Sequence, residues 1–294
     1  MSNFEDLRKR TSNGSIRLIH VEAVPRSIST ALSRALNESD TLSVYVNEPL
    51  NGMKHDIQAA AGYILEAADS ISRSNDLQVV VITKNLSRNL TLPLFQEWMG
   101  ICDGIVWSVR DPLVQMGSLI TRVANDLTFE PGVDRLEQHE VTPVHIEAVA
   151  AYLMKAAPIS FSKTSWTDMG EHFRSAYYPK RSIVIDGGRL TSHPEEVLRH
   201  ASDVLNLPYS RHMVTGWRHG YVNKNPGHNP KLSDAERAWT KHAVTSNGIV
   251  RVDRLPFDLS LLPDSLRLHI TNVAMPIYKE MVGHSTQEDL QAIR

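Results

Sequence analysis

The stretch that decides the fold is residues 16–50, IRLIHVEAVPRSISTALSRALNESDTLSVYVNEPL. It begins with an apolar run, 16–24, which stops at the hexapeptide PRSIST, 25–30, and a helical pattern follows at once. A buried strand that turns directly into a helix is a geometry that binds phosphate. The first amides of such a helix have no partner within it, and they carry the positive end of the helix dipole. The order of elements therefore predicts an anion site at the turn.

The side chains of this hexapeptide suit the same ligand. Arg26 supplies a forked positive charge, while Ser27, Ser29 and Thr30 supply hydroxyl donors. The alternative is an ordinary capped helix, because serine and threonine are favoured helix caps. On this segment alone both interpretations stay open.

Composition describes an ordinary soluble protein. Of the 294 residues, 41% are hydrophobic and 22% are charged, and the formal net charge is −2, so no global positive field would attract nucleic acid or anionic lipid. The single cysteine, Cys102, excludes an internal disulfide and fits a reducing compartment. Residues 1–15 are polar, unlike a secretory signal, and no apolar run approaches the ~18 residues of a membrane span. We expect a cytoplasmic protein without nucleic-acid or membrane partners, and a homodimer stays open.

Apolar runs alternate with helical patterns along the chain. Besides 16–24 the runs are 77–83, 101–109 and the shorter 182–185, and each precedes polar residues and a helical pattern. This alternation predicts an α/β fold with a parallel sheet flanked by helices on both faces. Ligands in such sheets bind beyond the carboxyl ends of the strands.

Nothing in the sequence divides the chain, so we expect one domain over 1–294. Within it, the loop-rich segments 123–180 and 215–231 are expected to form a substrate pocket or lid. Ser192 and Glu195 have the spacing of a capping box ahead of a helix over 195–205, and Ser233 and Glu236 repeat it.

A second group of polar residues follows the run 101–109. Arg110 comes directly after it, Ser118 lies eight positions on and Arg122 twelve, and the four-residue spacing puts the last two on one helix face. The three side chains could converge on one phosphate; alternatively, Arg110 is salt-bridged and Arg122 is solvated. Asp111 is interpreted as a helix cap, with Pro112 at the first helical position.

Together the two motifs look like the cofactor site of sulfotransferases that use 3′-phosphoadenosine 5′-phosphosulfate (PAPS). The resemblance covers about residues 16–210, is closest to the tyrosylprotein and bacterial small-molecule branch, and implies a P-loop NTPase-like sulfotransferase fold. It implies that the 5′-phosphosulfate is held by Arg26, Ser27, Ser29 and Thr30. It implies that the 3′-phosphate is held by Arg110 and Ser118, with Arg122 as a further basic position. Glu48, 22 residues after Arg26, matches an acidic residue of that branch.

The chain departs from this family at three points. Ile28 stands where many members have glycine, and Arg26 stands where many have lysine. A lysine can donate a proton to the departing phosphate, whereas arginine keeps its proton and only stabilises charge. The third departure is that the basic C-terminal loop often seen over the nucleotide in this family is not recognisable as such. Lys224 and Lys231, in the segment 215–231, are the candidates for it.

Sulfuryl transfer resembles phosphoryl transfer, in which positioning and charge stabilisation dominate. Our candidate base is Glu48, with His20 and His55 second, and Lys84 is a candidate to contact the bridging oxygen or the sulfuryl group. No metal is expected, because the chain has neither a GxxxxGK[ST] sequence nor an HExxH pattern.

The resulting hypothesis is transfer of a sulfuryl group from PAPS to a hydroxyl or amine of a small-molecule acceptor. The alternatives are a nucleotide-dependent phosphotransferase and a non-catalytic nucleotide-binding protein of the same fold. No sequence pattern names the acceptor.

Overall fold

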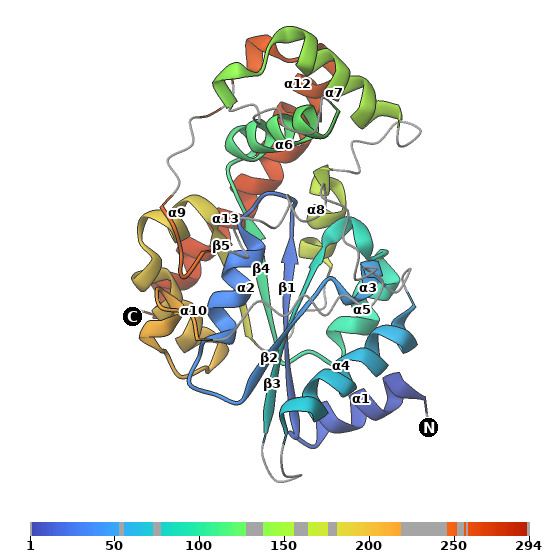
Figure 1. Ribbon diagram of the computed structural model, residues 1–294, viewed down its shortest axis with the longest axis vertical. Helices are drawn as coiled ribbons and strands as arrows, with labels where there is room; N and C mark the ends of the chain where they lie inside the picture. The colour runs from blue at the N-terminus through green and yellow to red at the C-terminus, as the bar shows by residue number, and fades with distance from the viewer. Residues whose placement is uncertain are drawn as a thin grey trace.

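The computed structural model describes residues 2–52, 56–72, 78–127, 138–155, 164–175, 181–218, 246–251, 256 and 258–292. Within these residues a five-stranded sheet has the order β2-β3-β1-β4-β5, and every neighbouring pair is parallel (Figure 1). The strands are β1 (Ile16–Ala23), β2 (Ser43–Asn47), β3 (Val79–Leu86), β4 (Gly104–Val109) and β5 (Arg181–Asp186). The apolar run that opens the deciding stretch is thus the central strand.

Helices precede the first strand, connect the strands and follow the last one. They are α1 (Asn3–Ser12), α2 (Ser29–Asn37), α3 (Pro49–Gly52), α4 (Ile57–Ile71), α5 (Leu92–Met99), α6 (Pro112–Leu127), α7 (Pro143–Lys155), α8 (Trp166–Arg174), α9 (Gly187–Ser192), α10 (Pro194–Leu205), α12 (Asp264–His269) and α13 (Met275–Ala292). Shorter turns are the 3₁₀ segments η1 (Ser87–Asn89), η2 (Gln138–Glu140), η4 (Arg211–Met213) and η5 (Leu259–Leu261), and the π-helical segment η6 (Ile270–Ala274).

Three apolar clusters organise the packing. The largest joins one face of the sheet to α1, α4, α5, α8 and α13, and it contains Trp98, Trp107 and Trp166. A second joins the opposite face to α2 and α10. A third joins α6, α7 and α12, which lie above the sheet in Figure 1. The expected parallel sheet with helices on both faces is confirmed.

Local boundaries show where the sequence patterns were right and where they were wrong. Asp111 caps α6 as predicted, because its Oδ1 accepts a hydrogen bond of 2.8 Å from Leu113 N. The predicted capping box at Ser192 is wrong. Pro194 takes the first position of α10, His193 precedes it, and the Ser192 hydroxyl donates to Gly188 O within α9 (3.0 Å).

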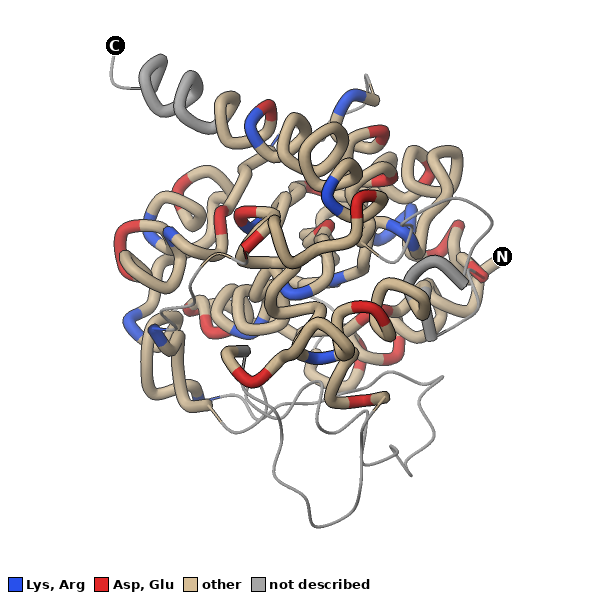
Figure 2. Tube along the Cα trace, turned by 90° about the horizontal axis from the view of Figure 1, so that it is seen from above, with Lys and Arg blue, Asp and Glu red and all other residues tan. Residues whose placement is uncertain are grey.

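Several predicted features lie outside the described residues. These are His55, Lys224, Lys231 and the second capping box at 233–236. In the part of the chain that is described, no helix has the length and apolarity needed to cross a membrane. Figure 2 shows the positive and negative residues interspersed, in keeping with a net charge of −2.

Candidate functional site

The turn after β1 has an unusual backbone. Arg26 and Ile28 both have positive φ, 66° and 71°. A left-handed conformation costs an L-residue roughly 1–2 kcal/mol, and a β-branched residue such as Ile28 rarely adopts it. Ile28 thus adopts a conformation that glycine would adopt without strain. It is also the residue that precedes α2, and no side chain caps the helix there, so the interpretation as a Ser/Thr-capped helix is not what the structure has.

The hydroxyl groups of the turn have different roles. Ser27 is buried, and its hydroxyl donates to Val24 O (2.8 Å) and lies 3.0 Å from the Ser108 hydroxyl at the end of β4. Ser27 therefore fixes the turn to the sheet. Ser29 is buried and Thr30 half-buried, both in the first turn of α2. These two remain predictions for ligand contact.

The two predicted phosphate-binding motifs meet in the structure. Arg26 Nε donates a hydrogen bond of 3.0 Å to Ser118 Oγ, across 92 residues of sequence. Arg110, directly after β4, and Arg122, within α6, are 5% and 7% exposed, so both arginines are largely withdrawn from water. An ion pair of 2.7 Å joins Arg122 to Asp126 one turn later.

Two helices, α6 and α9, contact the turn after β1. Gln115 of α6 donates to Pro25 O (2.9 Å) and accepts from the Trp166 indole of α8 (3.4 Å). On the other side, Gly187 opens α9 so close to the turn that a Cβ there would lie 2.7 Å from Ser27 O. The sequence predicted neither Gln115 nor Gly187 as a contact of this turn. A glutamine within a helical pattern carries no functional signal in a sequence.

Glu48 and Lys84 lie together at the ends of β2 and β3. Glu48 has a φ of 46°, its backbone N–H donates to Lys84 O (2.6 Å), and the Lys84 ammonium donates to its carboxylate. The side chains are 16% and 5% exposed. The sequence placed Lys84 at the end of its strand; β3 continues to Leu86, so Lys84 lies two residues before that end. The predicted base thus has a cationic partner in place.

Arg88 and Asp168 are the site residues that the sequence reasoning missed. Arg88 belongs to η1, directly after β3, and Asp168 to the first turn of α8. Burial away from water lowers the pKa of Arg88. Electrostatic interactions with Glu48, Tyr152 and Asp168 act in the opposite direction but do not offset it. Burial raises the pKa of the Asp168 carboxyl. The position of Arg88 just beyond a strand was the signal available in the sequence.

His20, the second candidate base, lies in the interior. It is fully buried in β1, where Nε2 donates to Glu22 (2.8 Å) and Nδ1 lies 3.0 Å from the Thr83 hydroxyl. A residue without access to solvent or to the edge of the sheet is not placed to deprotonate an acceptor.

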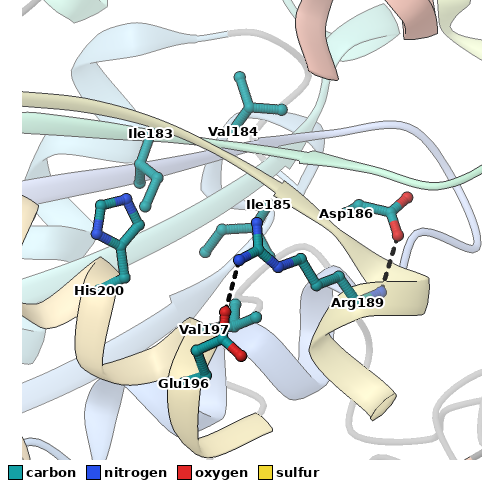
Figure 3. Close-up of a pocket in the computed structure, with 8 residues that line it drawn as sticks. All are labelled: Ile183, Val184, Ile185, Asp186, Arg189, Glu196, Val197 and His200. Carbon is teal, nitrogen blue, oxygen red and sulfur yellow. Dashed lines mark hydrogen bonds and ion pairs between the residues drawn. The ribbon is translucent and has the colours of Figure 1, made fainter. Parts of the chain in front are cut away.

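A small crevice beside the outer strand β5 contains none of the predicted site residues (Figure 3). Arg189 spans it, with an ion pair of 2.6 Å to Glu196 and a backbone hydrogen bond of 2.8 Å to Asp186. Its accessible space is only about 30 Å³. Among the described residues, no three His, Cys, Asp or Glu side chains are grouped so as to hold a metal ion.

No protein-family model and no curated protein matches this chain. Several solved structures are similar to it, among them the following three. The sulfotransferase domain from the curacin biosynthetic pathway is 15% identical, with a TM-score of 0.47 over 87% of this chain and 96% of that one. The sulfotransferase domain from the Synechococcus PCC 7002 olefin synthase is 14% identical, with a TM-score of 0.42 over 87% of this chain and 94% of that one. Mouse sulfotransferase SULT7A1, complexed with PAP, is 12% identical, with a TM-score of 0.38 over 96% of this chain and 90% of that one. All three are described as sulfotransferases.

Proposed function

We propose that this protein transfers a sulfuryl group from PAPS to a hydroxyl or amine of a small-molecule acceptor. The observation that carries the proposal is the hydrogen bond between Arg26 and Ser118. It joins the turn suited to the 5′-phosphosulfate to the helix suited to the 3′-phosphate. One nucleotide with phosphate groups at both positions would fit such a pair of sites.

The donor site is built from charge and backbone. The first amides of α2 and the guanidinium of Arg26 would hold the 5′ group. Arg110, Ser118 and Arg122 would hold the 3′-phosphate, where low exposure strengthens each charge interaction. The left-handed backbone of Arg26 and Ile28 supports this role, because strained residues that persist in a fold concentrate at ligand sites.

The transfer itself needs few groups. The acceptor oxygen attacks sulfur, the bond from sulfur to the bridging oxygen breaks, and the negative charge passes to the departing phosphate. Glu48 takes the proton of the acceptor, and Lys84 holds the Glu48 carboxylate in its ionised form. Arg26 balances the charge on the phosphate. No proton needs to move from Arg26, which is consistent with arginine in place of the usual lysine.

A non-catalytic nucleotide-binding protein is the second candidate. The engagement of Glu48 by Lys84 favours it, since a carboxylate that already accepts from a buried ammonium is a weaker base. This candidate predicts nucleotide binding without turnover.

Glu48→Gln tests the catalytic proposal. The change keeps the size of the side chain and removes its basicity, so turnover with PAPS should fall by ~10²-fold or more while affinity for 3′-phosphoadenosine 5′-phosphate (PAP) is unchanged. Turnover is measured by mass spectrometry of the sulfated product. The control is Glu195→Gln, on the exposed surface of α10, which should behave as the wild type. Near-normal turnover in Glu48→Gln would refute the assignment of the base.

A further inference from the structure

A network of three ionisable side chains lies beneath the site. Glu22 of β1 is fully buried, and both of its carboxylate oxygens accept hydrogen bonds from histidines. His20 Nε2 donates to one oxygen (2.8 Å) and His172 Nδ1 of α8 to the other (2.7 Å). The ring of His172 stacks on Phe95 of α5, with centroids 4.2 Å apart and an interplanar angle of 2°.

The donors fix how this network is protonated. The Trp98 indole N–H donates to His20 Nδ1 (3.3 Å), so the proton of His20 is on Nε2, the atom that faces Glu22. Burial alone would raise the pKa of Glu22, and the hydrogen bonds from His172 and His20 more than offset it, so that the net shift is downward. Glu22 is therefore an ionised carboxylate in the core, and removing either donor leaves it under-satisfied.

The two histidines differ in what they hold. The contacts of His20 are with the sheet and with α5, through Thr83 and Trp98. His172 is on α8, so its bond to Glu22 ties that helix to the central strand. The same helix is also tied at its start. The hydroxyl of Ser87, the residue directly after β3, donates to the carbonyl oxygen of Ser165, the residue directly before α8 (3.1 Å).

The helix fixed in this way lies next to η1, the turn that follows β3 and carries Arg88. Asp168 is in its first turn, one turn before His172, and it acts electrostatically on Arg88, which also feels the charge of Glu48. Asp168, Arg88 and Glu48 come from three separate segments. Their relative positions depend on how α8 lies against the ends of the strands.

We infer that Glu22 and His172 are positioning residues of the acceptor site, which fix α8, and with it Asp168, relative to Arg88 and Glu48. The inference rests on the proposed function. It makes α8 a specificity element. The donor turn touches α8 only through Gln115 and Trp166, and it is also held by Ser108 and by the start of α9, so the acceptor side depends more strongly on this pair.

The test compares two matched variants, His172→Phe and His20→Phe. Each removes one donor to the same buried carboxylate, and phenylalanine at 172 retains the stack on Phe95. Hydrogen exchange of the α8 amides is measured in the ligand-free protein. Sulfuryl transfer from PAPS is measured with benzyl alcohol as the acceptor. If the wild type does not sulfate benzyl alcohol, hydrolysis of PAPS, in which water is the acceptor, is measured in its place. PAP affinity is measured by calorimetry.

In His172→Phe we expect faster exchange in α8 and a loss of at least about tenfold in transfer efficiency, since small misplacements near a reacting centre cost up to ~10²-fold. PAP affinity should fall less than transfer efficiency, because the donor turn is also held by Ser108 and by the start of α9. His20→Phe should lose stability and keep wild-type exchange in α8 and wild-type transfer. His172→Asn places an amide N–H near the Nδ1 position, and it should restore most of both readouts.

If His172→Phe does not fold, His172→Gln, whose amide lies near the Nε2 position, replaces it in the comparison with His172→Asn.

Equal effects of the two phenylalanine variants, or unchanged α8 exchange in His172→Phe, would overturn the inference. A wild-type protein that does not bind PAP would overturn the proposed function, and the inference with it. A wild type that transfers normally, with both variants equal to it, would overturn the inference alone.

Discussion

Arg26, Ile28 and Glu48 each have a positive φ, and each lies just beyond the end of a parallel strand. None is glycine, so each conformation costs free energy that the rest of the fold offsets. The three residues belong to the two segments from which we build the donor site and the base. At the residue scale, local strain and the proposed chemistry coincide.

His269 gives a prediction at the same scale. It is buried, its Nε2 lies 2.9 Å from the Thr164 hydroxyl, and burial lowers its pKa from 6.5 to about 4. The unfolded chain binds a proton near pH 6.5 and the folded chain only near pH 4. The free energy of unfolding should therefore fall as pH drops through this window, by up to about 3 kcal/mol at 1.36 kcal/mol per pKa unit.

His269→Asn removes this titration. Urea denaturation at several pH values between 6.5 and 4 should show a shallower decline for the variant than for the wild type. Carboxyl groups that titrate in both proteins cancel in the difference between the two curves. Parallel curves would show that His269 does not stay neutral in the folded protein.

At the scale of elements, the turn after β1 depends on its neighbours for its shape. The Ser27 hydroxyl joins it to β4, Gln115 joins it to α6, and the start of α9 packs directly against its backbone. Such contacts hold a strained turn in one conformation before any ligand binds.

Gly187→Ala tests the contact with α9. The added Cβ would lie 2.7 Å from Ser27 O and 3.4 Å from Val109 O, both backbone atoms, so α9 or the turn must move. We expect a loss of stability of about 1–3 kcal/mol, the usual effect of overpacking, and weaker PAP binding.

The control is Gly283→Ala in α13, where an added Cβ meets nothing within 4 Å. This variant should be neutral or slightly more stable, because alanine favours the helix. Thermal unfolding with and without PAP measures both effects. A Gly187→Ala protein with wild-type stability and affinity would mean that the turn tolerates displacement of α9.

At the scale of the whole molecule, the sequence predicted the layered architecture well. Buried parallel strands are near-continuous apolar runs, so the patterns at 16–24, 77–83, 101–109 and 182–185 located four of the five strands to within a few residues. The rule that ligands bind at carboxyl ends then directed attention to the edge of the sheet where Glu48 and Lys84 pair and Arg26 meets Ser118.

What the sequence could not predict depends on contacts between distant segments. Glu22 and His172 are 150 residues apart, and nothing in either local pattern indicates the other. The role of Ser27 was also hidden, because only the packing of β4 shows that its hydroxyl is used within the protein. The capping box at Ser192 failed because Pro194 determined where α10 begins.

The most direct test of the account is the affinity for PAP against that for adenosine 5′-phosphate, measured by calorimetry on the wild type and on Arg110→Ala. The two nucleotides differ in the 3′-phosphate, for which Arg110, Ser118 and Arg122 are proposed. We predict much tighter binding of PAP by the wild type. Arg110→Ala should weaken it at least about tenfold, since a lost hydrogen bond to a charged group costs ~1.5–3 kcal/mol. Equal affinity of the wild type for the two nucleotides would contradict the account.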